Sequence, residues 1–217
     1  MRKLDTRLYF ITDSTNYTET EFLMRVEAAL QGGVTLLQLR EKNRTTREYI
    51  SLAQKVHDIA LRYHVPLVID DRVDVALAVD AEGVHVGAED MPVAMARKLM
   101  GEDKIVGATA KTVLWALDVY AQGADYLGVG AIFPTTTKVK TVLTSTDTLR
   151  DICHAVPIPV NAIGGLNPSN IDVLAGIPIA GICVVSAIMK AADPKQAAEA
   201  LWDRSVALGI CREEREI

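Results

Sequence analysis

The sequence predicts a single-domain (β/α)8 barrel over residues 1–217, in which eight parallel strands alternate with helices. Three observations support this prediction. Short apolar or β-branched runs alternate with amphipathic stretches along the chain. Most of the short runs are apolar at successive positions, which is typical of parallel strands buried on both faces. The length of 217 residues also fits one such barrel, which takes roughly 200 to 250 residues.

The elements follow in order along the chain. Strands are expected at Leu8–Ile11, Val34–Leu39, Pro66–Ile69, Gly83–Val86, Ile105–Ala108, Tyr126–Val129, Pro159–Ile163 and Gly181–Val185. Helical stretches are expected at Glu21–Gln31, Thr46–Tyr63, Pro92–Met100, Thr112–Gln122 and Pro194–Leu208, with a shorter one near Val73–Val79. An open doubly wound sheet is the alternative architecture, but no G-x-G-x-x-G motif follows the first strand.

Composition and charge narrow the classes of function. A net charge of −5 argues against a general nucleic-acid binder, so any anion site must be local. The polar clusters described below lead us to expect small phosphorylated molecules as partners. No apolar run approaches the ~18 residues of a membrane-spanning helix, and no signal peptide is recognised, so we expect a cytoplasmic protein. Cys153, Cys183 and Cys211 suggest neither a disulfide framework nor a zinc site, and Cys183 is expected in the core. The oligomeric state stays open, with a homodimer as one alternative.

In a (β/α)8 barrel the carboxyl ends of all strands open onto the face that carries the active site. After the second strand, alternation places Gln38, Arg40 and Lys42 on the same side, where an amide and two cations can converge on an anion such as a diphosphate. A solvated charged loop is the alternative interpretation.

Two acidic side chains follow the third and fourth strands. Asp71 and Asp90 are candidates to share a hard cation, because Mg2+ takes one or two carboxylates together with waters and substrate phosphates. The alternative for Asp90, which precedes Met91 and Pro92, is to cap the next helix. His85 is expected to be a hydrogen-bonded core residue rather than a catalytic base.

The later strands are followed by hydroxyls, glycines and cations. Thr109 is a candidate hydroxyl for a substrate, and Thr112 is expected to cap a helix. The loop 134–140 offers three hydroxyls and two cations, which suit phosphate oxygens. A flexible polar loop is the alternative, and the two interpretations are compatible if the loop closes over a ligand. Gly164–Gly165 and Ser186 fall where such barrels bind phosphate, although a Gly-Gly pair alone is also typical of a plain turn. No Ser-His-Asp or Cys-His nucleophile set is recognised.

Taken together, these motifs resemble the thiamine phosphate synthase (thiamine-phosphate pyrophosphorylase) family over nearly the whole chain. The matching segments are Gln38-Leu39-Arg40-Glu41-Lys42, Asp71-Arg72-Val73-Asp74, Gly83-Val84-His85-Val86-Gly87 with Glu89-Asp90, Gly128-Val129-Gly130 with Phe133-Pro134-Thr135-Thr136-Thr137-Lys138, and Ile163-Gly164-Gly165 with Val185-Ser186-Ala187-Ile188. The resemblance implies a transferase of thiamine biosynthesis. Such an enzyme joins 4-amino-2-methyl-5-hydroxymethylpyrimidine diphosphate to 4-methyl-5-(2-hydroxyethyl)thiazole phosphate, or its carboxylated form, and releases diphosphate through a carbocation-like step.

The resemblance also implies roles for individual residues. Contacts with the pyrimidine diphosphate are implied for Gln38, Arg40, Lys42, Asp70, Thr109 and Lys138, of which Arg40, Lys42 and Lys138 would act in catalysis. Contacts with the thiazole phosphate are implied for Thr135, Thr137, Gly165, Val185 and Ser186, and Mg2+ ligation for Asp71 and Asp90. Three positions depart from the family pattern: Asp70 stands where Asn is frequent, Ala88 where Gln is common, and Lys140 where an acidic residue is frequent.

Two other functions compete with this interpretation. A related barrel of the thiazole tautomerase type needs an acid/base residue but no metal, so the Asp71 and Asp90 pair counts against it. A non-catalytic sensor of thiamine phosphate or its precursors would have no evident use for that pair or for the leaving-group cations. Other phosphate-binding barrels share only the loops after the seventh and eighth strands, and the fold alone does not separate them.

Overall fold

Each predicted apolar run forms a strand in the computed structural model, which describes residues 4–135 and 142–210. The strands are β1 (Leu8–Ile11), β2 (Leu36–Leu39), β3 (Leu67–Asp70), β4 (Gly83–Val86), β5 (Ile105–Ala110), β6 (Tyr126–Gly130), β7 (Val160–Ile163) and β8 (Gly181–Val184). Every strand pairs in parallel with its sequence neighbour, and β1 pairs with β8, which closes the barrel. The barrel prediction is therefore confirmed, and the open-sheet alternative is wrong.

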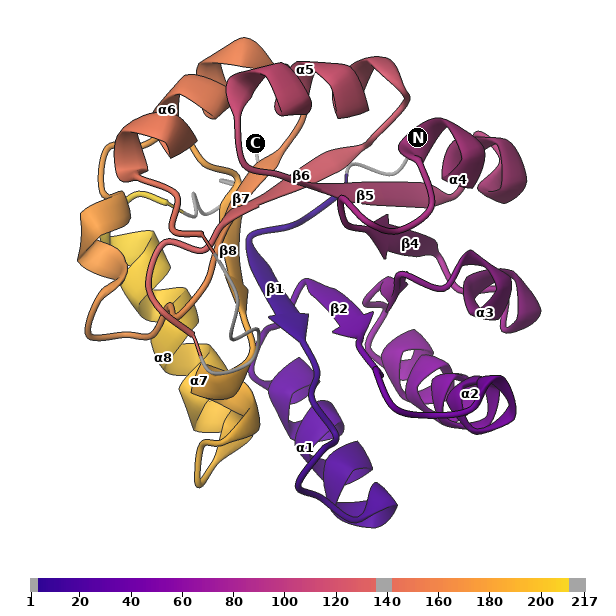
Figure 1. Ribbon diagram of the computed structural model, residues 1–217. Helices are drawn as coiled ribbons and strands as arrows, with labels where there is room; N and C mark the ends of the chain where they lie inside the picture. Colours follow the sequence, from indigo (N-terminus) through magenta and orange to yellow (C-terminus); the bar gives the residue numbers. More distant parts are fainter. Residues whose placement is uncertain (1–3, 136–141, 211–217) are drawn as a thin grey trace, which may run out of the picture.

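Helices surround the strands as an outer ring (Figure 1). They are α1 (Glu19–Gln31), α2 (Thr46–Arg62), α3 (Val73–Ala78), α4 (Val93–Met100), α5 (Val113–Ala121), α6 (Thr146–Ala155), α7 (Ser186–Met189) and α8 (Pro194–Ala207), with a 3-10 helix η1 at Ile171–Leu174. The short helix predicted near Val73 is present. Within the described ranges, each helix is too short or too polar to cross a bilayer.

Side-chain capping explains where several helices begin. Thr18, Thr45, Thr112 and Ser145 each accept a hydrogen bond from the backbone N–H three residues ahead, as helix N-caps do. The predicted cap at Thr112 is confirmed. Helix α4 instead begins after Pro92 with no side-chain cap, so the capping alternative for Asp90 is wrong.

Strand side chains alternate between two cores, as the pleat of a barrel requires. The outer core lies between strands and helices, and the inner core fills the barrel with Tyr9, Ile11, Leu36, Val68, Tyr126 and Cys183. The prediction that Cys183 is buried is confirmed. Gly107 leaves room for the large ring of Tyr126, because a Cβ at Gly107 would lie 2.2 Å from Tyr126 Cζ. The inner core thus carries two tyrosine hydroxyls beneath the carboxyl ends of the strands.

Candidate active site

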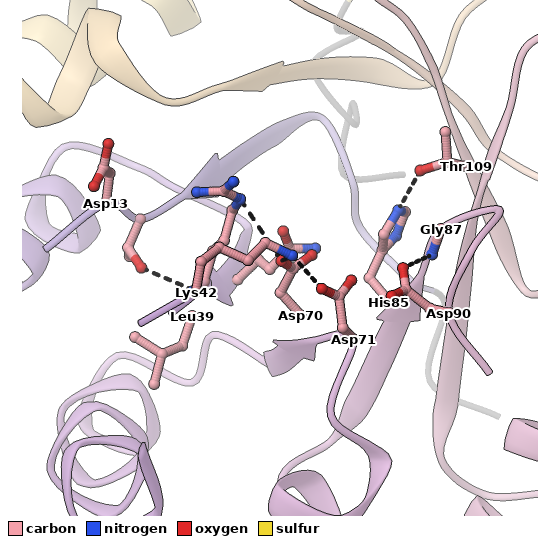
Figure 2. Close-up of polar contacts among 12 residues, drawn as sticks. Asp13, Leu39, Lys42, Asp70, Asp71, His85, Gly87, Asp90 and Thr109 are labelled. Carbon is pink, nitrogen blue, oxygen red and sulfur yellow. Dashed lines mark hydrogen bonds and ion pairs between the residues drawn. The ribbon is translucent and has the colours of Figure 1, made fainter. Parts of the chain in front are cut away.

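Two cations and two carboxylates meet at the carboxyl ends of β2 and β3 (Figure 2). Lys42 Nζ lies 2.8 Å from Asp70 Oδ2 and also donates a hydrogen bond to Asp71. Arg40 Nε lies 3.7 Å from Asp70 Oδ2. Arg40 and Lys42 thus reach the same carboxylate, and their contact with a diphosphate stays a prediction.

Backbone conformation at the end of β3 sets the position of Asp71. Its φ of +61° lies in the left-handed region, which aspartate tolerates better than most residues. The Asp71 N–H donates to the carbonyl oxygen of His85 at 2.8 Å, which anchors this turn to β4. Across the turn, Asp90 Oδ2 accepts a hydrogen bond from the Gly87 N–H at 2.9 Å. The backbone of Asp71 and the carboxyl group of Asp90 are thus held by β4 and the loop after it.

The charges of this cluster act on one another. Burial raises the pKa of Asp70, and this effect outweighs the lowering by Lys42 and Arg40. Burial also raises the pKa of Asp90, with a further increase from the Asp71 carboxyl beside it. Burial opposes a raised pKa at Lys42, but Asp70 and Asp71 overcome it and raise the pKa of that ammonium. The cluster therefore holds closely spaced carboxylates that an additional cation would stabilise.

A line of hydrogen bonds runs through the inner core, and we call its five members the barrel chain. Gln38 Nε2 donates to Tyr9 Oη at 2.5 Å, and the hydroxyl oxygens of Tyr9 and Tyr126 lie 2.7 Å apart. Tyr126 Oη is 3.1 Å from His85 Nδ1, and His85 Nε2 is 3.0 Å from Thr109 Oγ1. The prediction that His85 is a hydrogen-bonded core residue is confirmed. Gln38 was predicted beside Arg40 and Lys42, but the residue is only 2% exposed and its side chain bonds to Tyr9.

Gly165 allows the loops after β6 and β7 to lie in close contact. Gly165 has a φ of +64°, and a Cβ there would lie 2.7 Å from Pro134 O and 2.8 Å from Phe133 Cβ. The glycine therefore permits a direct contact with the loop that leads to Thr135. The side-chain amides of Asn167 and Asn170 both donate to the Gly165 carbonyl oxygen, at 3.3 and 2.9 Å.

Two more of the predicted phosphate contacts, Val185 and Ser186, lie among the described residues. Val185 is the N-cap residue of α7 and Ser186 is its first residue, directly after β8. Thr137 and Lys138, and with them Lys140, lie outside the described residues.

A cavity of about 360 Å3 opens between the loops after β1 and β2 and the end of α7. It is lined by Asp13, Thr15, Asn16, Arg40, Lys42, Asn43 and Lys190. A smaller neighbouring pocket shares Asp13, Asn16 and Lys190 with it and reaches Val185 and Ser186. Asp13, Asn16 and Lys190 thus lie between the predicted diphosphate contacts, Arg40 and Lys42, and the predicted thiazole phosphate contacts, Val185 and Ser186. The sequence did not point to these three lining residues, because single polar residues in loops carry no periodic signal.

No group of three or more His, Cys, Asp or Glu side chains arranged to hold a metal occurs within residues 4–135 and 142–210. Asp71 and Asp90 are a pair, and a site for a magnesium ion that keeps waters and substrate oxygens needs no third protein carboxylate. The magnesium assignment therefore stays a prediction.

Comparison with known proteins identifies a common ancestry. Residues 8–188 match the family described as "Thiamine monophosphate synthase". Thiamine-phosphate synthase 2 of Streptococcus pneumoniae is 54% identical over 187 residues, which cover 86% of this chain and 89% of that protein. Thiamine-phosphate synthase of Enterococcus faecalis is 53% identical over 185 residues, which cover 85% and 87%.

Two solved structures have the same fold as this chain. Thiamine phosphate pyrophosphorylase from Pyrococcus furiosus superposes with a TM-score of 0.85 at 38% identity, covering 94% of this chain and 98% of that one. 3-Hexulose-6-phosphate synthase superposes with a TM-score of 0.69 at 17% identity, covering 91% and 99%, and this likeness concerns the fold alone.

Proposed function

The chain belongs to the thiamine monophosphate synthase family, and we propose on that basis that it is a thiamine-phosphate synthase. The reaction would join 4-amino-2-methyl-5-hydroxymethylpyrimidine diphosphate to 4-methyl-5-(2-hydroxyethyl)thiazole phosphate or its carboxylated form. The products would be thiamine phosphate and diphosphate. The observation that carries the proposal is the meeting of Arg40 and Lys42 in the lining of a cavity at the mouth of the barrel. A smaller neighbouring pocket, which shares lining residues with this cavity, is lined by Ser186.

Arg40 and Lys42 are proposed to bind the diphosphate and to stabilise its negative charge as it leaves. Their positions support this role, because both cations line the cavity and both reach Asp70. Lys138 is proposed as a third cation for the diphosphate, from its place in the family motif. Gln38, Thr109 and Asp70 would complete the pyrimidine site.

The bond between the pyrimidine methylene carbon and the diphosphate oxygen would break first, and both bonding electrons would leave with the diphosphate. The thiazole nitrogen would then use its lone pair to bond to the methylene carbon. Neither step needs an enzymatic nucleophile or a base at the reacting atoms. The protein's part is to bind both substrates and stabilise developing charge. Thr135, Thr137, Gly165, Val185 and Ser186 are proposed to hold the thiazole phosphate.

Asp71 and Asp90 are proposed to hold a magnesium ion. Their carboxyl groups fit such an ion, since the pair is close enough for Asp71 to raise the pKa of Asp90, a repulsion that a divalent cation would relieve. When bound, Mg2+ would neutralise part of the diphosphate charge and so ease its departure.

The experiment for this proposal is to incubate purified protein with both substrates and Mg2+ and to identify thiamine phosphate by mass spectrometry. The proposal expects thiamine phosphate in an amount equal to the diphosphate released. A thiazole phosphate isomer without any diphosphate would point to the tautomerase alternative.

A further inference from the structure

Lys190 lies where the two groups of predicted anion contacts meet. It follows α7 directly and lines the cavity of about 360 Å3 together with Arg40 and Lys42, the predicted diphosphate contacts. It also lines the smaller neighbouring pocket with Val185 and Ser186, the predicted thiazole phosphate contacts. A lysine carries a compact charge on a flexible stem, so this ammonium group can serve an anion in either place.

The ammonium group of Lys190 has no carboxylate partner. In the described part of the chain Lys190 forms no ion pair, whereas the two other cations of the cavity both contact Asp70. Asp13 is the carboxylate in both linings, and its Oδ1 accepts hydrogen bonds from the N–H and O–H of Thr15, at 3.1 and 2.5 Å. A ligand anion that reaches Lys190 therefore has no protein carboxylate to displace from it.

The backbone that carries Lys190 is held by the loop after β1 and by α1. Tyr17 Oη donates to the carbonyl oxygen of Met189 at 2.7 Å. Arg25 Nη1 donates to the same oxygen at 3.3 Å and to the carbonyl oxygen of Ala191 at 2.8 Å. The Arg25 guanidinium also lies over the Tyr17 ring, 4.6 Å from its centre. Because the carbonyl groups on both sides of Lys190 are fixed, its side chain starts from a fixed point beside the cavity.

We propose that Lys190 is a substrate-binding residue shared by the diphosphate and the thiazole phosphate, and that Tyr17 and Arg25 are positioning residues that hold it between them. An ammonium group donates charge-assisted hydrogen bonds to phosphate oxygens, and its three hydrogens allow bonds to two anions at once. The inference deepens the proposed function and rests on it.

The test is isothermal titration calorimetry with the thiazole phosphate and with inorganic diphosphate plus Mg2+, each added alone. Without the pyrimidine diphosphate, no turnover disturbs the measurement. Lys190→Gln should raise the Kd of each probe about tenfold, because it removes a charge-assisted hydrogen bond. Lys190→Arg should restore most of the affinity, since it keeps a cation on a long stem. Lys195→Gln should change neither Kd, because Lys195 is an exposed lysine of α8 that pairs with Glu199 and lines neither cavity.

Tyr17→Phe tests the positioning role, because it removes the hydroxyl that donates to Met189 and keeps the ring beneath Arg25. It should raise both Kd values about threefold in the wild-type background and have no further effect in Lys190→Gln, as two coupled residues do. Equal losses in the two backgrounds would overturn the positioning role.

The outcomes separate this inference from the proposed function. A wild type that binds neither probe, or a Lys190→Gln variant that changes the Kd of only one probe or of none, would overturn the inference. Formation of thiamine phosphate by the wild type would then leave the proposed function standing. Weaker binding of both probes in Lys190→Gln, without diphosphate release by the wild type from the complete substrate mixture, would support the shared role of Lys190 and contradict the proposed function.

Discussion

Lys42 and Asp70 form an ion pair at the carboxyl ends of β2 and β3, with 2.8 Å between Nζ and Oδ2. Lys42 is the cation proposed for the diphosphate, and Asp70 stands where the family often has Asn. A diphosphate must therefore compete with a buried carboxylate for this ammonium. A substitution at Asp70 therefore tests directly whether its carboxylate competes with the diphosphate for Lys42.

Asp70→Asn should lower the KM for the pyrimidine diphosphate about threefold to tenfold, because a partly exposed ion pair is worth on the order of 1 kcal/mol. Steady-state kinetics at saturating thiazole phosphate measure the change. Asp74→Asn is a matched control, since Asp74 pairs with Arg72 on the exposed side of the turn. An unchanged or higher KM in Asp70→Asn would contradict the competition.

The stability of the protein should depend on the protonation of Asp70. Burial raises the pKa of Asp70 above the ordinary 3.8, so the folded chain holds this proton more tightly than the unfolded chain. The resulting stabilisation is present at low pH and is lost as pH rises through the interval between 3.8 and the raised value. Urea unfolding at a series of pH values should show Asp70→Asn gaining stability relative to wild type across that interval. A difference independent of pH would contradict burial as the dominant effect.

Asp71→Asn and Asp90→Asn should each raise the Mg2+ concentration for half-maximal activity at least about tenfold, the loss that follows even from removing outer partners of a metal site. Glu89→Gln, a change at an exposed neighbouring carboxylate, should leave it unchanged. Binding of paramagnetic Mn2+ to the protein gives an independent readout. Equal affinity for Mn2+ in wild type and both aspartate variants would remove them from the metal site.

Gly165→Ala should raise the KM for the thiazole phosphate more than that for the pyrimidine diphosphate. The new Cβ would lie 2.7 Å from Pro134 O and push apart the loops after β6 and β7. Gly176→Ala is the control. Gly176 also has a positive φ, of 75°, but a Cβ added there would lie in open space. Both variants should lose about 1 kcal/mol of stability from backbone strain, and Gly165→Ala should lose more because of the clash. Only Gly165→Ala should alter the KM.

Arg40→Ala and Lys138→Ala should each lower turnover by on the order of 10²-fold or more, if each cation stabilises charge that develops on the leaving diphosphate. Arg44→Ala controls for the loss of a nearby cation, since Arg44 pairs with Glu41. Unchanged kcat in Lys138→Ala would discard the role that the family motif suggests for it.

The barrel was predictable because it rests on repeated apolar runs, and all eight runs became strands. The strand boundaries differ where hydrogen bonding to the neighbouring strand sets them, which composition does not show. Strand β2, for example, begins at Leu36 instead of Val34. Helix α6 was not among the expected helices, because it begins in a polar run, Thr144 to Thr148, whose hydroxyl and aspartate residues are typical of a loop.

The clustering of charged side chains was predictable where these residues follow strands directly, as at Arg40, Lys42, Asp71 and Asp90, and their roles stay predictions. The barrel chain was not, because Tyr9 and Tyr126 sit in apolar strands whose pattern does not show which face points into the barrel. The partnership of Lys42 with Asp70 and Asp71 was also missed, since it depends on two neighbouring strands ending at the same level.

The most direct test of the account is diphosphate release by the purified protein, measured with Mg2+ and both substrates and again with each component omitted. The account predicts release only when Mg2+, the pyrimidine diphosphate and the thiazole phosphate are all present. Release that proceeds equally without the thiazole phosphate, or no release from well-folded protein, would contradict it.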